Sequence, residues 1–106
     1  MAWIYLLIAG LFEVAWAHAM KQSDGFTKLW PTVSMAATML ASFVLLSLAM
    51  RSLPLGTAYA VWTGIGAVGA FAVGIAAHGE PVTVLRLAAC GLIVAGLVLM
   101  KFTAPS

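Results

Sequence analysis

Charged residues are scarce in this sequence. Only 8% of its 106 residues are Asp, Glu, Lys or Arg, whereas 64% are hydrophobic. A soluble globular domain carries roughly 25% charged and about 45–50% apolar residues, so this composition excludes an ordinary water-facing surface. We therefore expect lipid to surround most of the chain, and the length leaves room for a single domain.

Several other features that would indicate a function are also lacking. The one cysteine, Cys90, excludes an internal disulfide, and the five Lys and Arg residues form no basic run of the kind that binds nucleic acid. The sequence shows no nucleophile elbow, no Ser–His–Asp pattern and no metal-ligand spacing. We expect neither an enzyme nor a cofactor or metal site, and no nucleic-acid partner.

Four long apolar stretches are present instead. They cover residues 3–20, 31–50, 57–77 and 84–100. Each has about 17–21 residues, or roughly 26–32 Å as a helix, which matches the ~30 Å hydrocarbon core of a bilayer. The first is not expected to be a signal peptide, because no positive region precedes it and Glu13 interrupts it. The sequence thus predicts an all-α integral membrane protein of four transmembrane helices, the whole chain forming one domain.

Short polar breaks separate the four stretches, so consecutive helices should run antiparallel. Pro31 suits the first turn of the second helix, and Thr57 is the expected N-cap of the third. Lys and Arg are nearly balanced between the two sides of the membrane. Arg51 and Lys101 lie on one side, and Lys21, Lys28 and Arg86 on the other. This weak bias permits insertion in both orientations.

Glu13 is the residue most indicative of function. A carboxylate at the centre of a membrane helix costs about 2.5–3.5 kcal/mol, and such residues are rarely idle. Every Lys and Arg lies near the end of a predicted span, so Glu13 has no evident permanent counter-ion. It must therefore be protonated, or paired with a cation that comes and goes. A structural carboxylate bonded to a neighbouring helix is the alternative.

Aromatic residues accompany Glu13 within the spans. Trp16 follows it at i+3, and Tyr59, Trp62 and Gly66 form an i, i+3, i+7 stripe on the third helix. The face of an aromatic ring attracts cations by about 0.5–2 kcal/mol. Deep tryptophans also serve as plain packing, so spacing alone leaves both interpretations open.

Glycine is frequent in the third and fourth spans. Gly64, Gly66 and Gly69 match G-x-G-x-x-G, but an apolar helix with no preceding strand excludes a dinucleotide site. We expect close helix packing or hinges instead. The candidates are Gly10, Gly64, Gly66, Gly69, Ala70, Gly74, Gly91 and Gly96. Gly91 and Gly96 suggest a contact between subunits.

His18 and His78 have no expected functional role. His18 lies about 140° around the helix from Glu13, on a different face. His78 and Glu80 are expected to be solvated or capping residues in a loop.

Two segments of the chain resemble a known family. Residues 10–14 read GLFEV, and residues 53–66 read LPLGTAYAVWTGIG. Both are similar to the small multidrug resistance family, and the resemblance extends over essentially the whole chain. Within that family, residues 13–17 (EVAWA), Ser42 and residues 62–66 (WTGIG) resemble the guanidinium-exporting branch. The drug-exporting branch typically has a small or hydroxyl residue in place of Trp16.

The resemblance implies an antiparallel homodimer with one shared central site in the bacterial inner membrane. It implies export of guanidinium in exchange for protons, with small guanidinyl and quaternary ammonium cations as further candidate substrates. Carried over by position, Glu13 is the carboxylate that binds proton and substrate, and Trp16, Ser42, Tyr59 and Trp62 surround it. Trp16 and Trp62 would stack on the flat cation, while Ser42 and Tyr59 would hold the carboxylates.

Four alternatives remain open. The first is a broad exporter of quaternary ammonium and other drug-like cations from the same family. The second is half of a heterodimeric transporter, and the third is a passive channel. The fourth is a structural subunit, which would require a permanent protein partner for Glu13.

Overall fold

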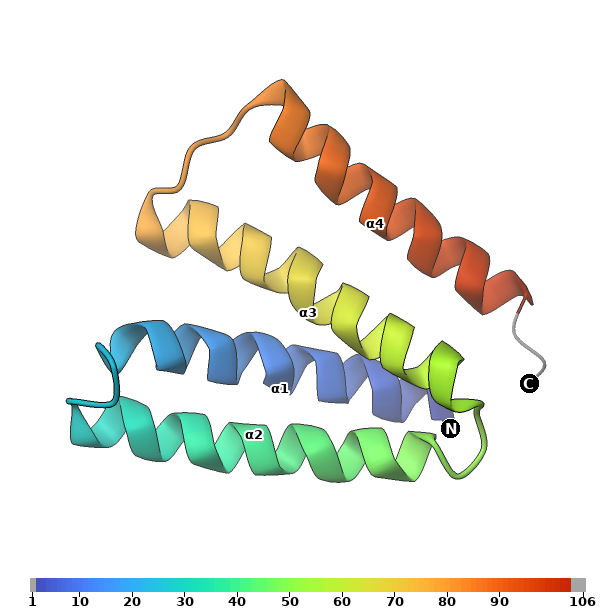
Figure 1. Cartoon of the computed structure of the whole chain (residues 1–106), viewed down its shortest axis with the longest axis horizontal. Coiled ribbons are helices and arrows are strands. Elements are labelled where there is room, and N and C mark those ends of the chain that lie inside the picture. The colour runs from blue at the N-terminus through green and yellow to red at the C-terminus, as the bar shows by residue number, and fades with distance from the viewer. Residues whose placement is uncertain (1, 104–106) are drawn as a thin grey trace.

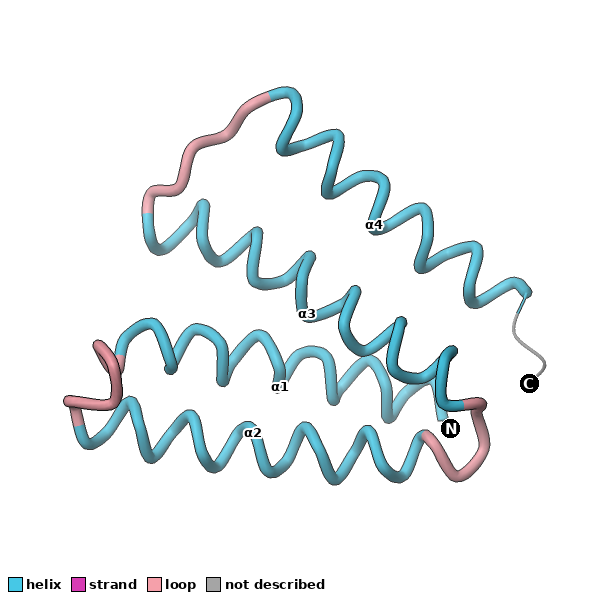
Figure 2. Tube along the Cα trace, in the orientation of Figure 1, coloured by secondary structure: helices cyan, strands magenta, loops and turns pink. Residues whose placement is uncertain are grey.

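The computed structural model describes residues 2–103, and this part of the chain is entirely helical apart from its connecting loops. The four helices are α1 (Ala2–Gln22), α2 (Leu29–Ala49), α3 (Leu55–His78) and α4 (Val84–Thr103) (Figure 1). Each is long and apolar enough to cross a membrane. The loops between them are short (Figure 2). The predicted all-α fold with four spanning helices is confirmed.

The ends of α3 are set by residues with special backbone properties. Pro54, and not the expected Thr57, is the N-cap, with an extended backbone (φ −60°, ψ 152°). The carbonyl of Pro54 accepts the N–H of Ala58 at 3.0 Å, so the helix begins two residues before Thr57. At the other end Gly79 adopts a left-handed conformation (φ 65°), which glycine tolerates without steric cost. In α2, Pro31 lies in the first turn, as expected.

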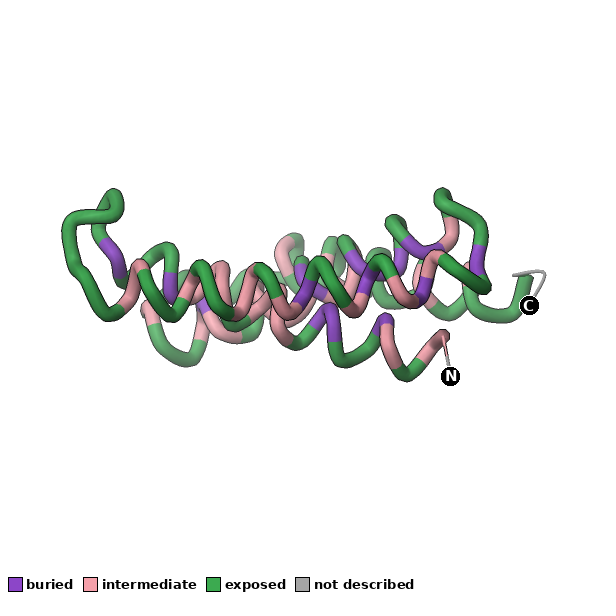
Figure 3. The backbone as a smooth tube through the Cα atoms, turned by 90° about the horizontal axis from the view of Figure 1, so that it is seen from below, coloured by how far each residue is buried: buried purple, intermediate pink, exposed green. Residues whose placement is uncertain are grey.

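The four helices form a thin slab. Its principal extents are 43 × 35 × 16 Å, and the edge-on view in Figure 3 shows how shallow it is. α1 packs against both α2 and α3, whereas α4 packs against α3 and touches α1 near its C-terminal end, where Nζ of Lys101 lies 4.5 Å from the centroid of the Trp3 ring. No residue of α4 is buried. α4 therefore presents most of its surface to whatever surrounds the chain.

The apolar core lies in the half of the slab that holds the N-terminus. It joins the first half of α1, the second half of α2 and the first half of α3. Its buried members are Leu6, Ala9, Leu46, Ala49, Leu53, Ala58, Val61 and Trp62. Glu13 follows Ala9 by one helical turn, so it lies next to this core and toward the opposite end of the molecule.

Candidate functional site

The Glu13 side chain projects from the middle of α1 onto α3. It is half-buried, and its carboxylate lies against the buried backbone of Gly66. A Cβ atom at Gly66 would collide with both the Oε1 and Cδ atoms of Glu13. The glycine therefore provides the space that the carboxylate occupies between the two helices.

Two polar atoms near this point have no partner. Within residues 2–103, Oε1 of Glu13 and Nε1 of Trp16 are buried and make no hydrogen bond. The one ion pair found in the same range joins Arg86 and Glu80, near the far end of α3. A buried polar atom without a partner costs about 1–3 kcal/mol, and more when it is charged. The site is thus an acceptor and a donor, one turn apart on α1, that still lack partners.

A chain of hydrogen bonds crosses three helices one turn away from Glu13. The Ser42 hydroxyl of α2 donates to the carbonyl of Ala9 in α1 at 2.7 Å. The indole Nε1–H of Trp62 in α3 donates to the Ser42 hydroxyl at 2.9 Å. Ser42 is fully buried and Trp62 nearly so. Because Ser42 has only one proton and donates it to Ala9, it positions Trp62 here and does not hold the Glu13 carboxylate.

Aromatic rings gather around Trp62. The ring centroids of Tyr59 and Phe43 lie 5.6 and 5.8 Å from that of Trp62. Trp62 and Gly66 are both buried, as the predicted stripe on α3 requires, whereas Tyr59 is 54% exposed. The structure thus brings Ser42, Tyr59 and Trp62 together. No feature of the sequence pointed to Phe43.

Trp16 and Trp62 lie at different depths. The hydrogen bonds that join Trp62 to Ser42 and Ser42 to Ala9 place Trp62 at the depth of Ala9. The contact between Glu13 and Gly66 lies one turn further along α1 and α3. Trp16 follows Glu13 by nearly another turn of α1. Within the chain the two indoles therefore lie on opposite sides of the carboxylate along the helix axis.

Small residues allow α1 to approach α3 closely. A Cβ at Gly10 would collide with Ile65, and one at Gly69 with Val14. On the other side of α3, Gly64 accommodates Leu97 of α4 in the same way. Gly91 and Gly96 differ, because a Cβ at either position would meet open space.

His78 is not the solvated loop residue that we expected. It is the last residue of α3, is partly buried, and contacts His18 of α1 across a ring-nitrogen distance of 3.1 Å. Both residues were visible in the sequence at the ends of two spans that finish on the same side of the membrane. The sequence therefore contained a signal for this pairing, namely the positions of the two histidines, which our sequence analysis did not use.

Comparison with known proteins identifies the family. Residues 1–93 match the family model described as Small Multidrug Resistance protein. The chain belongs to the small multidrug resistance family. It is 55% identical over 103 residues to a protein of Citrobacter freundii, which covers 97% of this chain and 98% of the relative. It is 52% identical over 103 residues to a protein of Escherichia coli (strain K12), with the same coverage. Both relatives are named "Guanidinium exporter".

Family membership agrees with the architecture. A small multidrug resistance protein with four helices able to cross a bilayer, and with bacterial relatives along its whole length, is a multi-pass protein of the cell membrane. The predictions of family and location are thereby confirmed.

Proposed function

We propose that this protein exports guanidinium in exchange for protons, and that two inverted copies of the chain form the transporter. The names of its relatives support the substrate. The observation that carries the mechanism is the unpartnered, buried Oε1 of Glu13 in the middle of a membrane-spanning helix. Such an atom needs a proton or a cation, and a transporter supplies each in turn.

Guanidinium matches the chemistry of this site. It is planar, stays charged at biological pH and presents N–H groups in a geometry that a carboxylate accepts in pairs. Either a proton or guanidinium neutralises Glu13, so the two compete for the same negative charge. Competition at one site that is exposed alternately to the two sides of the membrane produces antiport without a second regulatory site.

Aromatic faces add to cation binding. The hydrogen bond from Trp62 to Ser42 fixes the orientation of that indole, and Tyr59 packs beside it. A ring face placed over a cation contributes about 0.5–2 kcal/mol, the larger value when water is excluded. The half-exposed Tyr59 is free to turn toward an arriving substrate, whereas Trp62 is fixed in place.

The shape of the subunit supports a dimer. A slab 16 Å thick is too shallow to enclose a pathway, and α4 has no buried residue. Gly91 and Gly96 leave open space on α4 where another helix backbone would fit. An inverted second copy would also supply the inverted-repeat symmetry that many transporters use for alternating access.

Purified protein in liposomes tests the proposal. An outward guanidinium gradient should drive protons inward, as reported by a pH-sensitive dye inside the vesicles. A bulky quaternary ammonium gradient should drive much less proton movement, because Trp16 occupies the position where the drug-exporting branch has a small residue. Guanidinium flux without proton movement would instead indicate a channel, and equal responses to both cations would indicate a broad drug exporter.

A further inference from the structure

The only two histidines of the chain lie side by side at one end of the slab. Nδ1 of His18, in the last part of α1, lies 3.1 Å from Nε2 of His78, which ends α3. Their ring centroids are 5.1 Å apart. Neither imidazole belongs to the guanidinium site proposed above, because His18 follows Glu13 by more than a full turn of α1. The pair is therefore a separate feature of the molecule.

The distance between the two nitrogens is that of two imidazoles that share one metal ion. With metal–nitrogen bonds of 2.0–2.1 Å, two ligands lie about 3.3–3.4 Å apart in a tetrahedral site. In a square-planar site they lie about 2.9 Å apart. The observed 3.1 Å falls between these values. A hydrogen bond between the rings joins an N–H of one to the lone pair of the other at these same two nitrogen atoms. A metal ion bound to both nitrogens would displace the shared proton, which would move to the other nitrogen of the donating ring.

A cavity is present beside the two rings. It has a volume of about 170 Å³, and its lining includes His18, Lys21, Gly74, His78 and Glu80. One water molecule occupies about 30 Å³ in the liquid, so an ion and its remaining water ligands fit. Lys21 and Glu80 contribute opposite charges to the lining. The imidazole lone pairs, rather than an excess of negative charge, would therefore provide the affinity.

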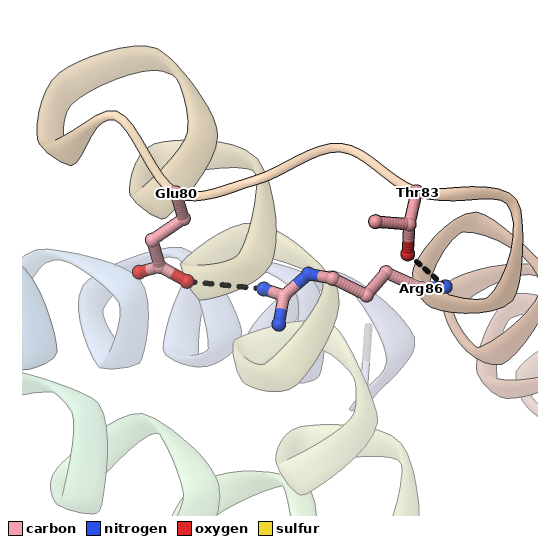
Figure 4. Close-up of polar contacts among 3 residues, drawn as sticks. All are labelled: Glu80, Thr83 and Arg86. Atoms are coloured by element: carbon pink, nitrogen blue, oxygen red, sulfur yellow. Dashed lines mark hydrogen bonds and ion pairs between the residues drawn. The ribbon is translucent and has the colours of Figure 1, made fainter.

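Glu80 is held at the edge of this cavity by two constraints. Its Oε1 atom accepts a hydrogen bond from the Arg86 guanidinium at 3.1 Å (Figure 4). Its carboxylate also lies against Gly74, where a Cβ would collide with it. Glu80 is a neighbour of the imidazole pair and not a third ligand, because no group of three His, Cys, Asp or Glu side chains within the described residues is arranged to hold a metal.

We infer that His18 and His78 together bind a divalent transition-metal ion of the Zn²⁺, Ni²⁺ or Cu²⁺ class, and so link α1 to α3. In the part of the chain that the structure describes, no group of three His, Cys, Asp or Glu side chains is arranged to hold a metal. The protein thus supplies two imidazoles and water completes the coordination. Binding is accordingly weaker than in a four-ligand structural site.

Calorimetric titration of the purified full-length protein, with no histidine tag, tests this inference. ZnCl₂ and NiCl₂ should bind at one ion per subunit. His18→Gln and His78→Gln should each weaken binding at least about tenfold, since even the loss of an outer-shell partner costs 10–100-fold. Lys21→Gln is the matched control: it lines the same cavity, keeps both imidazoles and should bind metal at least as well as the wild type.

Imidazole ¹⁵N spectra provide an independent reading, because each subunit gives signals from only two histidines. Both sets should move together on metal addition. Absence of stoichiometric binding, unchanged binding in His18→Gln, or movement of one histidine alone would overturn the inference. Circular dichroism and guanidinium exchange in metal-free buffer check that the variants fold. Retained exchange there would also show that a failure of the metal site leaves the proposed transport function intact.

Discussion

At the scale of single residues, placing the Glu13 carboxylate in the middle of a membrane-spanning helix costs free energy, and no neighbouring group lowers that cost by a hydrogen bond to its Oε1 atom. Gly66 makes room for the carboxylate but offers it no hydrogen bond, and Ser42 directs its proton to Ala9 instead. Ser42 and Trp62 are thus committed to one another, while Oε1 of Glu13 and Nε1 of Trp16 stay unpaired. This arrangement suits a group that must accept and release its partner in every transport cycle.

Replacement of Glu13 tests its role directly. Glu13→Gln keeps the shape of the side chain but removes its titratable charge, so we expect guanidinium to lose its ability to drive protons across the liposome membrane. The control is Asp24→Asn, which removes a carboxylate from the exposed turn between α1 and α2 and should exchange normally. Uphill guanidinium transport by Glu13→Gln under a proton gradient would exclude Glu13 as the coupling residue.

The same competition predicts a pH dependence. As the pH falls, protons occupy the Glu13 carboxylate and guanidinium must displace them, so the measured Kd should rise by up to about tenfold per pH unit for each proton displaced. Titration of guanidinium into detergent-solubilised protein over a series of pH values measures this slope. An affinity that is independent of pH would mean that substrate and proton bind at different places.

Ser42 provides a test of the hydrogen-bonded chain. Ser42→Ala leaves the buried indole N–H of Trp62 without an acceptor, and should lower the free energy of unfolding by about 1–2 kcal/mol. It should also weaken guanidinium binding, because Trp62 is no longer fixed in orientation. The control is Ser47→Ala, an exposed position on the same helix. Thermal unfolding in detergent compares them, and equal stability of the two variants would contradict the role given to Ser42.

At the scale of the helices, the contact between α1 and α3 depends on glycine. Gly66→Ala places a Cβ where the Glu13 carboxylate lies, so we expect a strong loss of guanidinium exchange as the carboxylate or the helix is displaced. Gly56→Ala is the control, because nothing lies within 4 Å of a Cβ at that position of α3. Its higher helix propensity should leave stability unchanged or raise it by up to about 1 kcal/mol. Similar exchange by both variants would show that the space at Gly66 is dispensable.

The sequence predicts the helices better than it predicts how they face one another. Twenty apolar residues in lipid can satisfy their backbone only as a helix, so the four spans follow from composition. The bond from Ser42 to Ala9 depends on how each helix is rotated about its axis, and helices that are apolar on every side give no signal for that rotation. Local chemistry was also misjudged at Pro54, where a proline carbonyl begins α3 in place of a Thr57 side chain.

At the scale of the whole molecule, the thin slab and the unburied α4 support the proposed second copy, and the near balance of basic residues is compatible with its inverted orientation. Membrane topology is therefore the deciding measurement. Gln22 and Ser52 are exposed at opposite ends of the slab and suit single-cysteine labelling once Cys90 is replaced. An impermeant maleimide applied to intact cells should label each of Gln22→Cys and Ser52→Cys to roughly half of its total, because the positive-inside preference is nearly cancelled.

A matched pair of variants gives this experiment its control. Adding two lysines beside Ser52 should drive that end to the cytoplasm, abolish external labelling at Ser52→Cys and, if inverted pairs are required, abolish guanidinium export. Co-expression with a copy that carries two extra lysines beside Gln22 should restore export, since the two biased chains insert oppositely. Labelling of the unbiased protein from one side only, or full export by one biased chain alone, would exclude the inverted homodimer and leave a parallel assembly to explain how the bare surface of α4 is covered.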